Sequence, residues 1–225
     1  KNGEILLYTI FSCLFGTVYV AAERGAGGAW APHEEGTFMA VTDKGFGAYD
    51  VRGVYPDEVN EELAYRVGRS FPTLFQAKSV AIGHDIRLSG PSLSDALAKG
   101  LTEAGCNVVD IGQCGTEMIY FTTAHLGLDG GIMITASHNP KQYNGMKFVR
   151  AESRPISSDT GLKDIAAMAV GGTYPDPTPS AGHIEKKDIL DEYVKHILSY
   201  VDVSKLKPYK IVVNTGNGAA GPIIN

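Results

Sequence analysis

Short apolar runs alternate with longer amphipathic segments from residue 57 to residue 149. An apolar residue recurs every fourth position over 57–76, which predicts a helix there, although Pro72 is expected to break or kink it. The following segments predict strand 79–83, helix 91–105, strand 107–112, helix 116–126, strand 131–135 and strand 146–149. Strands and helices that alternate at these spacings usually form a largely parallel sheet covered by helices. The sequence therefore predicts an α/β domain.

A second and shorter alternation follows a stretch rich in glycine and proline at 171–179. Apolar residues occupy one face of a helix predicted at 186–201, and 209–213 is predicted to be a strand that leads into a glycine-rich turn. One strand and one turn do not complete a domain. We therefore expect a first domain at 39–184 and the truncated start of a second, similar domain at 185–225.

The first 38 residues do not follow this pattern. Residues 5–22 carry no charge and are just long enough to span a bilayer or to form the apolar part of a signal peptide. The chain begins with Lys, and a glycine-rich stretch separates the apolar segment from Met39. We expect 1–38 to be an extension or a translation artefact outside the fold. A targeting or anchoring segment and a buried helix or strand are the alternatives.

Composition excludes several classes of function. The net charge is −5 and Lys and Arg form no cluster, which argues against a nucleic-acid partner but leaves room for a sugar phosphate held by a few cations. The three cysteines, Cys13, Cys106 and Cys114, are odd in number and form no C-x-x-C pair. They indicate neither a zinc site nor a disulfide framework, and they favour a reducing compartment, the cytoplasm. No feature indicates an oligomeric state.

One loop gathers residues that can perform chemistry together. The strand predicted at 131–135 leads Ser137 into the polar run T-A-S-H-N-P, where Pro140 opposes helix formation at the residue before it. Asn144 and Gly145 form a turn signal that returns the chain to a strand carrying Lys147. The loop can therefore present a hydroxyl, an imidazole, an amide and an ammonium group.

This loop resembles the phosphoserine loop of the α-D-phosphohexomutase family, whose members share T-x-S-H-N-P followed by N-G-x-K. F-G-A-Y-D-V-R-G at 46–53 and G-H-D-I-R-L-S-G at 83–90 are similar to two further family signatures, and 214–221 resembles the opening of the family's second domain. Because the four matches occur in order, the chain is identified as the N-terminal part of a member. The resemblance implies a three-layer α/β/α first domain whose mixed sheet has about four strands.

The resemblance also implies an intramolecular phosphotransferase, an isomerase that interconverts hexose 1-phosphates and 6-phosphates. Phosphorylated Ser137 would donate to a hexose monophosphate, and the resulting hexose bisphosphate, which is both intermediate and activator, would return its other phosphate. A phosphoserine carries about −1.5 to −2 charges at neutral pH, and its transfer depends on positioning and on neutralising that charge. Arg52 and Lys147 are the cations expected to neutralise it. His138 is expected beside the nucleophile, in proton transfer or orientation.

Each of these assignments has a structural alternative. Arg52 could simply pair with Asp50 or Asp57. Lys147 could face solvent, because it alternates with apolar residues on its strand. His138 could make a purely structural hydrogen bond.

Four further residues are expected to contact or frame the substrate, and they come from three separate motifs: Tyr49, Arg87, Asn139 and Asn144. For Arg87, and for Asp85 in the same motif, bracing of their own loop is an equal alternative. Asn144 also belongs to the predicted turn, where it would act mainly through the backbone.

Mg²⁺ is the cofactor that the resemblance implies, held by the phosphate of Ser137 and by three aspartates of a D-G-D-G-D-R run. The sequence contains no such run, and the substrate-selecting segments of the family's later domains are also absent, so this chain alone is expected to be inactive. Gly47 and His84 stand where many members carry a cation, which puts phosphate contacts from these two positions in doubt. The A-Y-D signature favours phosphomannomutase/phosphoglucomutase over phosphoglucosamine mutase, and it does not choose between mannose and glucose.

Three other classes of function remain as alternatives. The run G-x-G-x-x-G at 216–221 fits a dinucleotide-binding turn, but the helix and the acidic residue that should follow are missing. A serine hydrolase using Ser137 and His138 is disfavoured, because adjacent residues rarely face each other and no G-x-S-x-G elbow is present. A membrane-tethered, non-enzymatic fragment would require that 5–22 insert into a bilayer.

Overall fold

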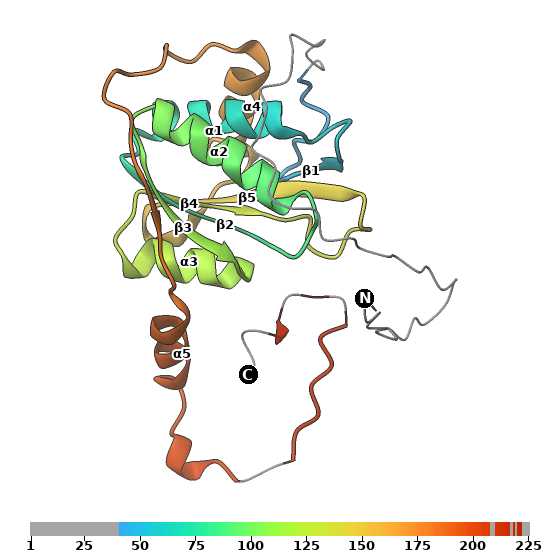
Figure 1. Cartoon of the computed structure of the whole chain (residues 1–225), viewed down its shortest axis with the longest axis vertical. Helices are drawn as coiled ribbons and strands as arrows, with labels where there is room; N and C mark the ends of the chain where they lie inside the picture. Colours follow the sequence, from blue (N-terminus) through green and yellow to red (C-terminus); the bar gives the residue numbers. More distant parts are fainter. Residues whose placement is uncertain (1–40, 208–209, 217, 219, 222–225) are drawn as a thin grey trace, which may run out of the picture. The chain divides into compact units, whose positions relative to one another are not determined.

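The computed structural model describes residues 41–207, 210–216, 218, 220 and 221. A mixed sheet forms the middle layer, with the strand order β1-β5-β4-β2-β3-β7 and with β6 beside β5 (Figure 1). Strands β2, β3, β4 and β7 are parallel, whereas β5 runs antiparallel to its neighbours β1, β4 and β6. The strands are β1 (Val51–Val54), β2 (Ser79–His84), β3 (Asn107–Gln113), β4 (Gly130–Ile134), β5 (Tyr143–Arg150), β6 (Arg154–Pro155) and β7 (Ile184–Lys186).

Helices cover both faces of this sheet. Helices α1 and α2 lie on one face with α4 and enclose a core around Phe71, Leu97 and Ile165, while α3 covers the other face around Ile119 (Figure 1). The helices are α1 (Glu61–Phe75), α2 (Gly90–Glu103), α3 (Thr116–His125), α4 (Leu162–Gly171) and α5 (Leu190–Leu198), with short 3₁₀ turns at Ala151–Ser153, Ser158–Thr160 and Val203–Lys205. The predicted three-layer α/β/α domain with a mixed sheet is confirmed.

Over the described residues the sheet has seven strands, where about four were expected. Strands β1, β6 and β7 contain only four, two and three residues. Segments of this length are too short to show a reliable alternation of apolar and polar residues. The expected number of strands was therefore too low.

Helix α1 differs from its prediction at its start and at Pro72. It begins at Glu61 rather than at residue 57, because Asn60 caps it: the side-chain oxygen of Asn60 accepts a hydrogen bond from the N–H of Leu63 at 2.9 Å. Pro72 does not break the helix, which continues to Phe75. The segment around Pro72 is buried, so packing stabilises a turn that lacks one backbone donor.

Strand β5 begins at Tyr143, so the predicted turn at Asn144 and Gly145 is wrong. Both residues are buried strand residues that lie opposite β1. A β-carbon on Gly145 would come within 1.9 Å of the carbonyl oxygen of Val51. Glycine is therefore needed here for the close approach of two strands and not for a turn.

The segment after α4 stays attached to the sheet. Residues 173–183 have no regular secondary structure, and β7 then pairs with β3, with Ile184 opposite Val108. The sheet thus includes residues on both sides of the expected boundary near 185. The start of a second domain remains a prediction.

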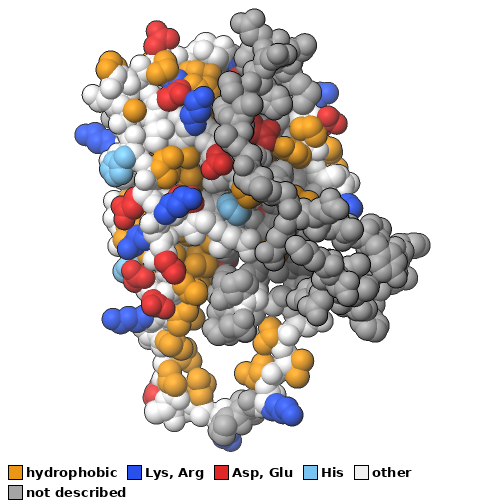
Figure 2. Space-filling model, in the orientation of Figure 1, with side chains coloured by type: hydrophobic (Ala, Val, Ile, Leu, Met, Phe, Trp, Pro, Cys, Tyr) orange, Lys and Arg blue, Asp and Glu red, His pale blue; other side chains and the backbone are white. Residues whose placement is uncertain are grey.

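Helix α5 is shorter than the helix predicted at 186–201. Ile189, just before it, is buried in the core that includes α3, whereas the outer face of α5 is apolar and exposed (Figure 2). The strand predicted at 209–213 is not formed over the described residues 210–213, where Ile211 and Val212 are exposed. No described strand pairs with them, and an unpaired segment leaves its backbone groups to water.

Within the described part of the chain, no helix has the length and apolar character needed to cross a bilayer. The apolar segment at 5–22, and the expectations for 1–38, lie outside the described residues.

Candidate active site

Ser137 lies in the loop between β4 and β5, at the carboxyl ends of the parallel strands β4 and β2. This edge of an open α/β sheet is the usual place for a ligand site. Ser137 is exposed and has a φ of 55°, which is uncommon for a residue other than glycine. Its N–H donates to the side-chain oxygen of Thr135 at 2.9 Å. The surrounding loop must therefore hold Ser137 in this conformation.

Arg87, in the loop between β2 and α2, holds the backbone of the serine loop. Its guanidinium donates to the carbonyl oxygens of Ser137 at 2.9 Å and of Asn139, Pro140 and Tyr143 at 2.8 Å each. Its Nε donates to Asp85 at 3.2 Å. All five N–H bonds of the guanidinium therefore point at protein acceptors. The geometry supports the bracing role and gives no support to the expected contact of Arg87 with substrate.

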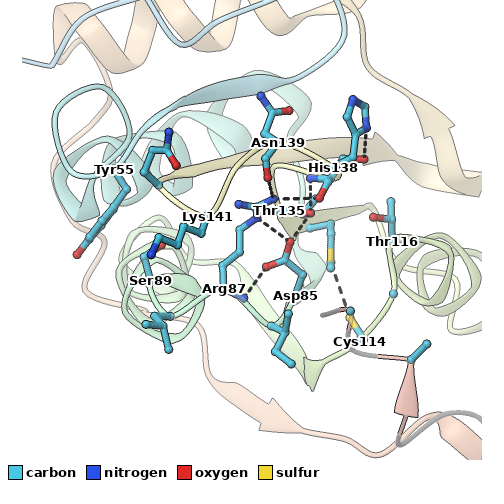
Figure 3. Close-up of a pocket in the computed structure, with 18 of the residues that line it drawn as sticks. Tyr55, Asp85, Arg87, Ser89, Cys114, Thr116, Thr135, His138, Asn139 and Lys141 are labelled. Carbon is cyan, nitrogen blue, oxygen red and sulfur yellow. Dashed lines mark hydrogen bonds and ion pairs between the residues drawn. The ribbon is translucent and has the colours of Figure 1, made fainter. Parts of the chain in front are cut away.

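Asp85 completes this connection between the two loops (Figure 3). One carboxylate oxygen accepts from Arg87 Nε and from the hydroxyl of Thr135 at 2.6 Å, and the other accepts from the N–H of Arg87 at 3.0 Å. The N–H of Asp85 donates to the carbonyl of Ile134 at 3.0 Å. The two loops therefore form one hydrogen-bonded unit around Ser137.

Arg52 and Lys147, the two cations predicted to act on the phosphate, meet at Asp50. The Oδ2 atom of Asp50 lies 2.9 Å from Arg52 Nε, 2.8 Å from Arg52 Nη2 and 3.0 Å from Lys147 Nζ. Arg52 Nη1 also donates to the Asn139 side chain at 2.7 Å and lies 3.5 Å from the Ala136 carbonyl. Arg52 thus pairs with Asp50, as in the structural alternative, and also reaches the serine loop.

His138 is exposed beside Ser137, and its Nδ1 lies 3.4 Å from the serine hydroxyl oxygen. This separation is longer than that of a normal hydrogen bond between such groups. Among the described residues, no acidic side chain is hydrogen-bonded to His138 as the third group that orients the base of a serine hydrolase would be, so the arrangement gives that alternative no support.

The other predicted substrate residues lie in different environments. Tyr49 is 76% exposed, and Asn139 is half-buried. Asn144 is fully buried, where its side chain donates to the hydroxyl of Ser89 at 2.8 Å and accepts from the N–H of Gly145 at 2.8 Å. This position does not support a contact between Asn144 and substrate, because both ends of the amide are occupied inside the fold.

Ser137 and His138 line a pocket of about 1230 Å³ that also includes Arg87, Glu117 and Lys141. Figure 3 shows Lys141 on the side of this pocket that faces Tyr55 and Ser89. Arg52 and Lys147 are not among the lining residues. Sequence analysis missed Lys141, although its position directly after the N-P dipeptide was an available signal. An exposed ammonium in this pocket can bind an anionic ligand.

Known proteins share this architecture. The family model of the phosphoglucomutase/phosphomannomutase α/β/α domain I matches residues 43–172. The chain belongs to this family. It is 51% identical over 181 residues to a phosphomannomutase of Salmonella montevideo, and the match covers 80% of this chain and 40% of the relative. It is 50% identical over 185 residues to phosphohexose mutases of Xanthomonas campestris pv. campestris, covering 82% of this chain and 41% of the relative.

The solved structures agree with this assignment. A phosphoglucomutase/phosphomannomutase family protein from Burkholderia thailandensis superposes with a TM-score of 0.73 at 34% identity, over 81% of this chain and 41% of that one. The chain spans about two fifths of the length of these phosphohexomutase relatives. The resemblance inferred from the sequence motifs is therefore confirmed at the level of the family.

A magnesium site of this phosphohexomutase domain is not formed by the described residues alone. Within residues 41–207 and the described positions after them, no group of three or more His, Cys, Asp or Glu side chains is placed to hold a metal ion. Asp85 and Asp50, the carboxylates in the hydrogen-bonded network around the serine loop, are each bound to cationic side chains. The residues present do not fit Mg²⁺, and no step of the chemistry is assigned to it.

The buried cysteines carry no chemistry of their own, and the glycine-rich run near the end of the chain is untested. Cys106 and Cys114 are buried, and burial raises the pKa of each thiol to about 12, so neither is a nucleophile at neutral pH. The run at 216–221 lies outside the residues matched by the family and is only partly described. The dinucleotide-binding alternative remains untested.

Proposed function

We propose that this chain is the phosphoserine-bearing part of a phosphohexose mutase and that Ser137 carries the phosphate. The observation that supports this most is the placement of Ser137. It is exposed at the ligand edge of the sheet, in a loop whose backbone is held by four hydrogen bonds from Arg87. A residue that gives and receives a phosphoryl group needs such a fixed position, because phosphoryl transfer depends mainly on positioning and charge neutralisation.

The transfer proceeds in two balanced steps. In the first, the P–O bond of phosphorylated Ser137 breaks, a new P–O bond forms to a free hydroxyl of the hexose monophosphate, and the proton of that hydroxyl returns to the serine oxygen. In the second, the serine oxygen forms a P–O bond to the other phosphate of the hexose bisphosphate, the P–O bond from that phosphate to the sugar breaks, and the serine proton passes to the freed sugar oxygen. His138 is the adjacent group that can carry the proton, once the 3.4 Å separation has shortened.

The other predicted residues have three roles in this proposal: supply of positive charge, contact with substrate, and support of the backbone. Arg52 and Lys147 supply positive charge from the base of the loop, and Lys141 supplies it from the pocket wall. Tyr49 and Asn139 are kept as substrate contacts. Arg87 and Asn144 act through the backbone of the serine loop and of β5.

Hexose phosphates are the proposed substrates, with mannose and glucose phosphates favoured because the relatives are named phosphomannomutases and phosphohexose mutases. Phosphoglucosamine mutase is the second candidate. A hexose bisphosphate is the proposed activator. Mg²⁺ is kept as a cofactor that the serine phosphate would help to bind. Because the described residues include no group of three or more His, Cys, Asp or Glu side chains placed to hold it, the isolated chain should not turn over hexose phosphates.

A chimera tests the proposal. The 181 matched residues of this chain replace the corresponding segment of the Salmonella phosphomannomutase, whose own serine segment is thereby removed. The chimera should convert mannose 1-phosphate to mannose 6-phosphate, and mass spectrometry should locate phosphate on Ser137. The Ser137→Ala chimera should lose both, while Ser158→Ala, at a half-buried serine in a 3₁₀ turn, should keep both. A folded chimera that carries its phosphate on another residue would refute the assignment.

A further inference from the structure

Asp50 is the carboxylate that holds both cations of the proposed phosphate site. A single oxygen, Oδ2, lies within 3.0 Å of Arg52 Nε, Arg52 Nη2 and Lys147 Nζ. The three side chains are between 16% and 28% exposed, so the cluster is shielded from water without being sealed. Charge interactions in such a position are stronger than on an open surface.

The same cation cluster touches the serine loop. Arg52 Nη1 donates to the side chain of Asn139 and lies near the carbonyl of Ala136, and these two residues flank Ser137 and His138. Arg52 therefore has one edge on Asp50 and the other on the loop. Its arrangement differs from that of Arg87, whose five N–H bonds hold Asp85 and the loop backbone. To leave Asp50, Arg52 or Lys147 has to break contacts with only one oxygen atom, Oδ2.

The charge balance of the cluster changes when Ser137 is phosphorylated. Without phosphate, two cations and one carboxylate leave one net positive charge. A serine phosphate adds about −1.5 to −2 charges and three strong acceptor oxygens, so it competes with Asp50 for the same donors. Asp50 also repels the phosphate. Two cations without Asp50 would neutralise the phosphate almost completely.

We propose that Asp50 is a positioning residue that shares Arg52 and Lys147 with the serine phosphate and so keeps that phosphate transferable. The inference rests on the proposed function. A mutase must pass the phosphate to the sugar and take it back, so a serine phosphate bound too tightly in the resting enzyme would slow every transfer. Asp50 offers Arg52 and Lys147 an alternative partner. The free-energy cost of breaking their contacts with the phosphate during transfer is lowered accordingly.

A thermodynamic cycle tests this inference without any catalysis. The 225-residue chain is made with serine or with synthetically incorporated phosphoserine at position 137, each with Asp50 and with Asp50→Asn. The quantity compared is the rise in melting temperature caused by the phosphate. We expect the rise to be larger in Asp50→Asn by about 3 °C or more, the shift given by one such interaction in a domain of this size. The subtraction removes any general destabilisation by the variant.

Asp176→Asn is the matched control. Asp176 is exposed in the segment before β7. Nearby, the N–H of Thr178 donates to the carbonyl of Glu103 at the end of α2, which places this segment at the opposite end of the strands from Ser137. Asp176→Asn removes the same charge as Asp50→Asn and should leave the phosphate-dependent rise in melting temperature at the wild-type value. Equal rises in the wild type and in Asp50→Asn would overturn the inference.

A second measurement covers the case in which Asp50→Asn does not fold. In the wild-type chain, the NMR signal of the Arg52 Nε–H should shift between the serine and phosphoserine forms as the cation changes partner. An unchanged signal would also overturn the inference.

The chimera separates this inference from the proposed function. Phosphate on a residue other than Ser137 would refute the function whatever the cycle shows. With Ser137 confirmed, the Asp50→Asn chimera should accumulate phosphoserine and lose kcat with little change in KM, and unaltered phosphoserine levels would refute the role of Asp50 alone.

Discussion

Replacement of Arg87 by Lys tests whether one guanidinium fixes the serine loop. Lysine keeps the positive charge beside Asp85 but offers three N–H bonds from one atom, against the five that Arg87 uses. At least two hydrogen bonds are therefore lost. Hydrogen bonds to charged groups contribute about 1.5–3 kcal/mol each. Because water can replace part of the loss in this exposed loop, we expect a local cost of about 2 kcal/mol.

Hydrogen exchange of the loop amides measures that cost directly. The N–H groups of Asn139 and Tyr143 bond to carbonyls within the loop at 3.1 Å and 3.0 Å. A local loss of about 2 kcal/mol corresponds to roughly 30-fold faster exchange of these amides. The exchange rates of the α1 amides should be unaffected, because none of the hydrogen bonds of Arg87 involves a residue of α1.

Arg154→Lys is the control, since Arg154 is an exposed arginine that forms an ion pair with Glu152 on the surface. It should leave exchange in the serine loop at the wild-type rate. Unchanged exchange at Asn139 and Tyr143 in Arg87→Lys would refute the bracing role. Equal acceleration throughout the sheet would show that Arg87 supports the whole fold and not the loop.

Three further predictions follow from the packing. Gly145→Ala should lower the free energy of unfolding by about 3 kcal/mol or more in urea denaturation, because the added β-carbon meets backbone, whereas Gly171→Ala, whose β-carbon has room, should not. Asn60→Ala should cost about 1 kcal/mol in the same assay through loss of the cap on α1, and an unchanged value would contradict the capping role. With Cys13 replaced by Ser, Cys106 and Cys114 should resist a thiol reagent at pH 8 until the protein unfolds. Burial raises the pKa of both thiols to about 12, so they stay protonated in the folded protein at pH values where they ionise in the unfolded chain. The free energy of unfolding should therefore fall as pH rises above about 9.

Two elements with glycines at their limits could be predicted closely from sequence. The strand at 107–112 and the helix at 116–126 each end within one residue of their predicted ends, and glycines at 105, 112, 115 and 127 flank or end them. Strand β7 could not be predicted, since all three of its residues are exposed and its pairing with β3 depends on where 173–183 runs. The Asn144–Gly145 turn was wrong because pairing with β1 outweighed the local preference.

The site divides in the same way. The serine loop was recognised from its motif, which is local in sequence. The contacts that organise it join residues far apart in the chain: Arg87 bonds to carbonyls 50 to 56 positions away, and Asp50 meets Lys147 across 97 positions. Alternatives such as bracing by Arg87 therefore stayed open until these distances were known. The same holds for Lys141, whose place in the pocket depends on how the loop folds.

The loop that carries Ser137 joins two interior strands of the sheet that lie side by side, β4 and β5. Most connections between strands in an α/β sheet pass through a helix, which can shift and absorb a change of length. Here Ile134 and Met146 face each other in register just behind the loop, so both of its ends are fixed in the core. An insertion or deletion between them would have to be accommodated by the loop alone. The position of Ser137 relative to the sheet is consequently set by the packing of β4 against β5.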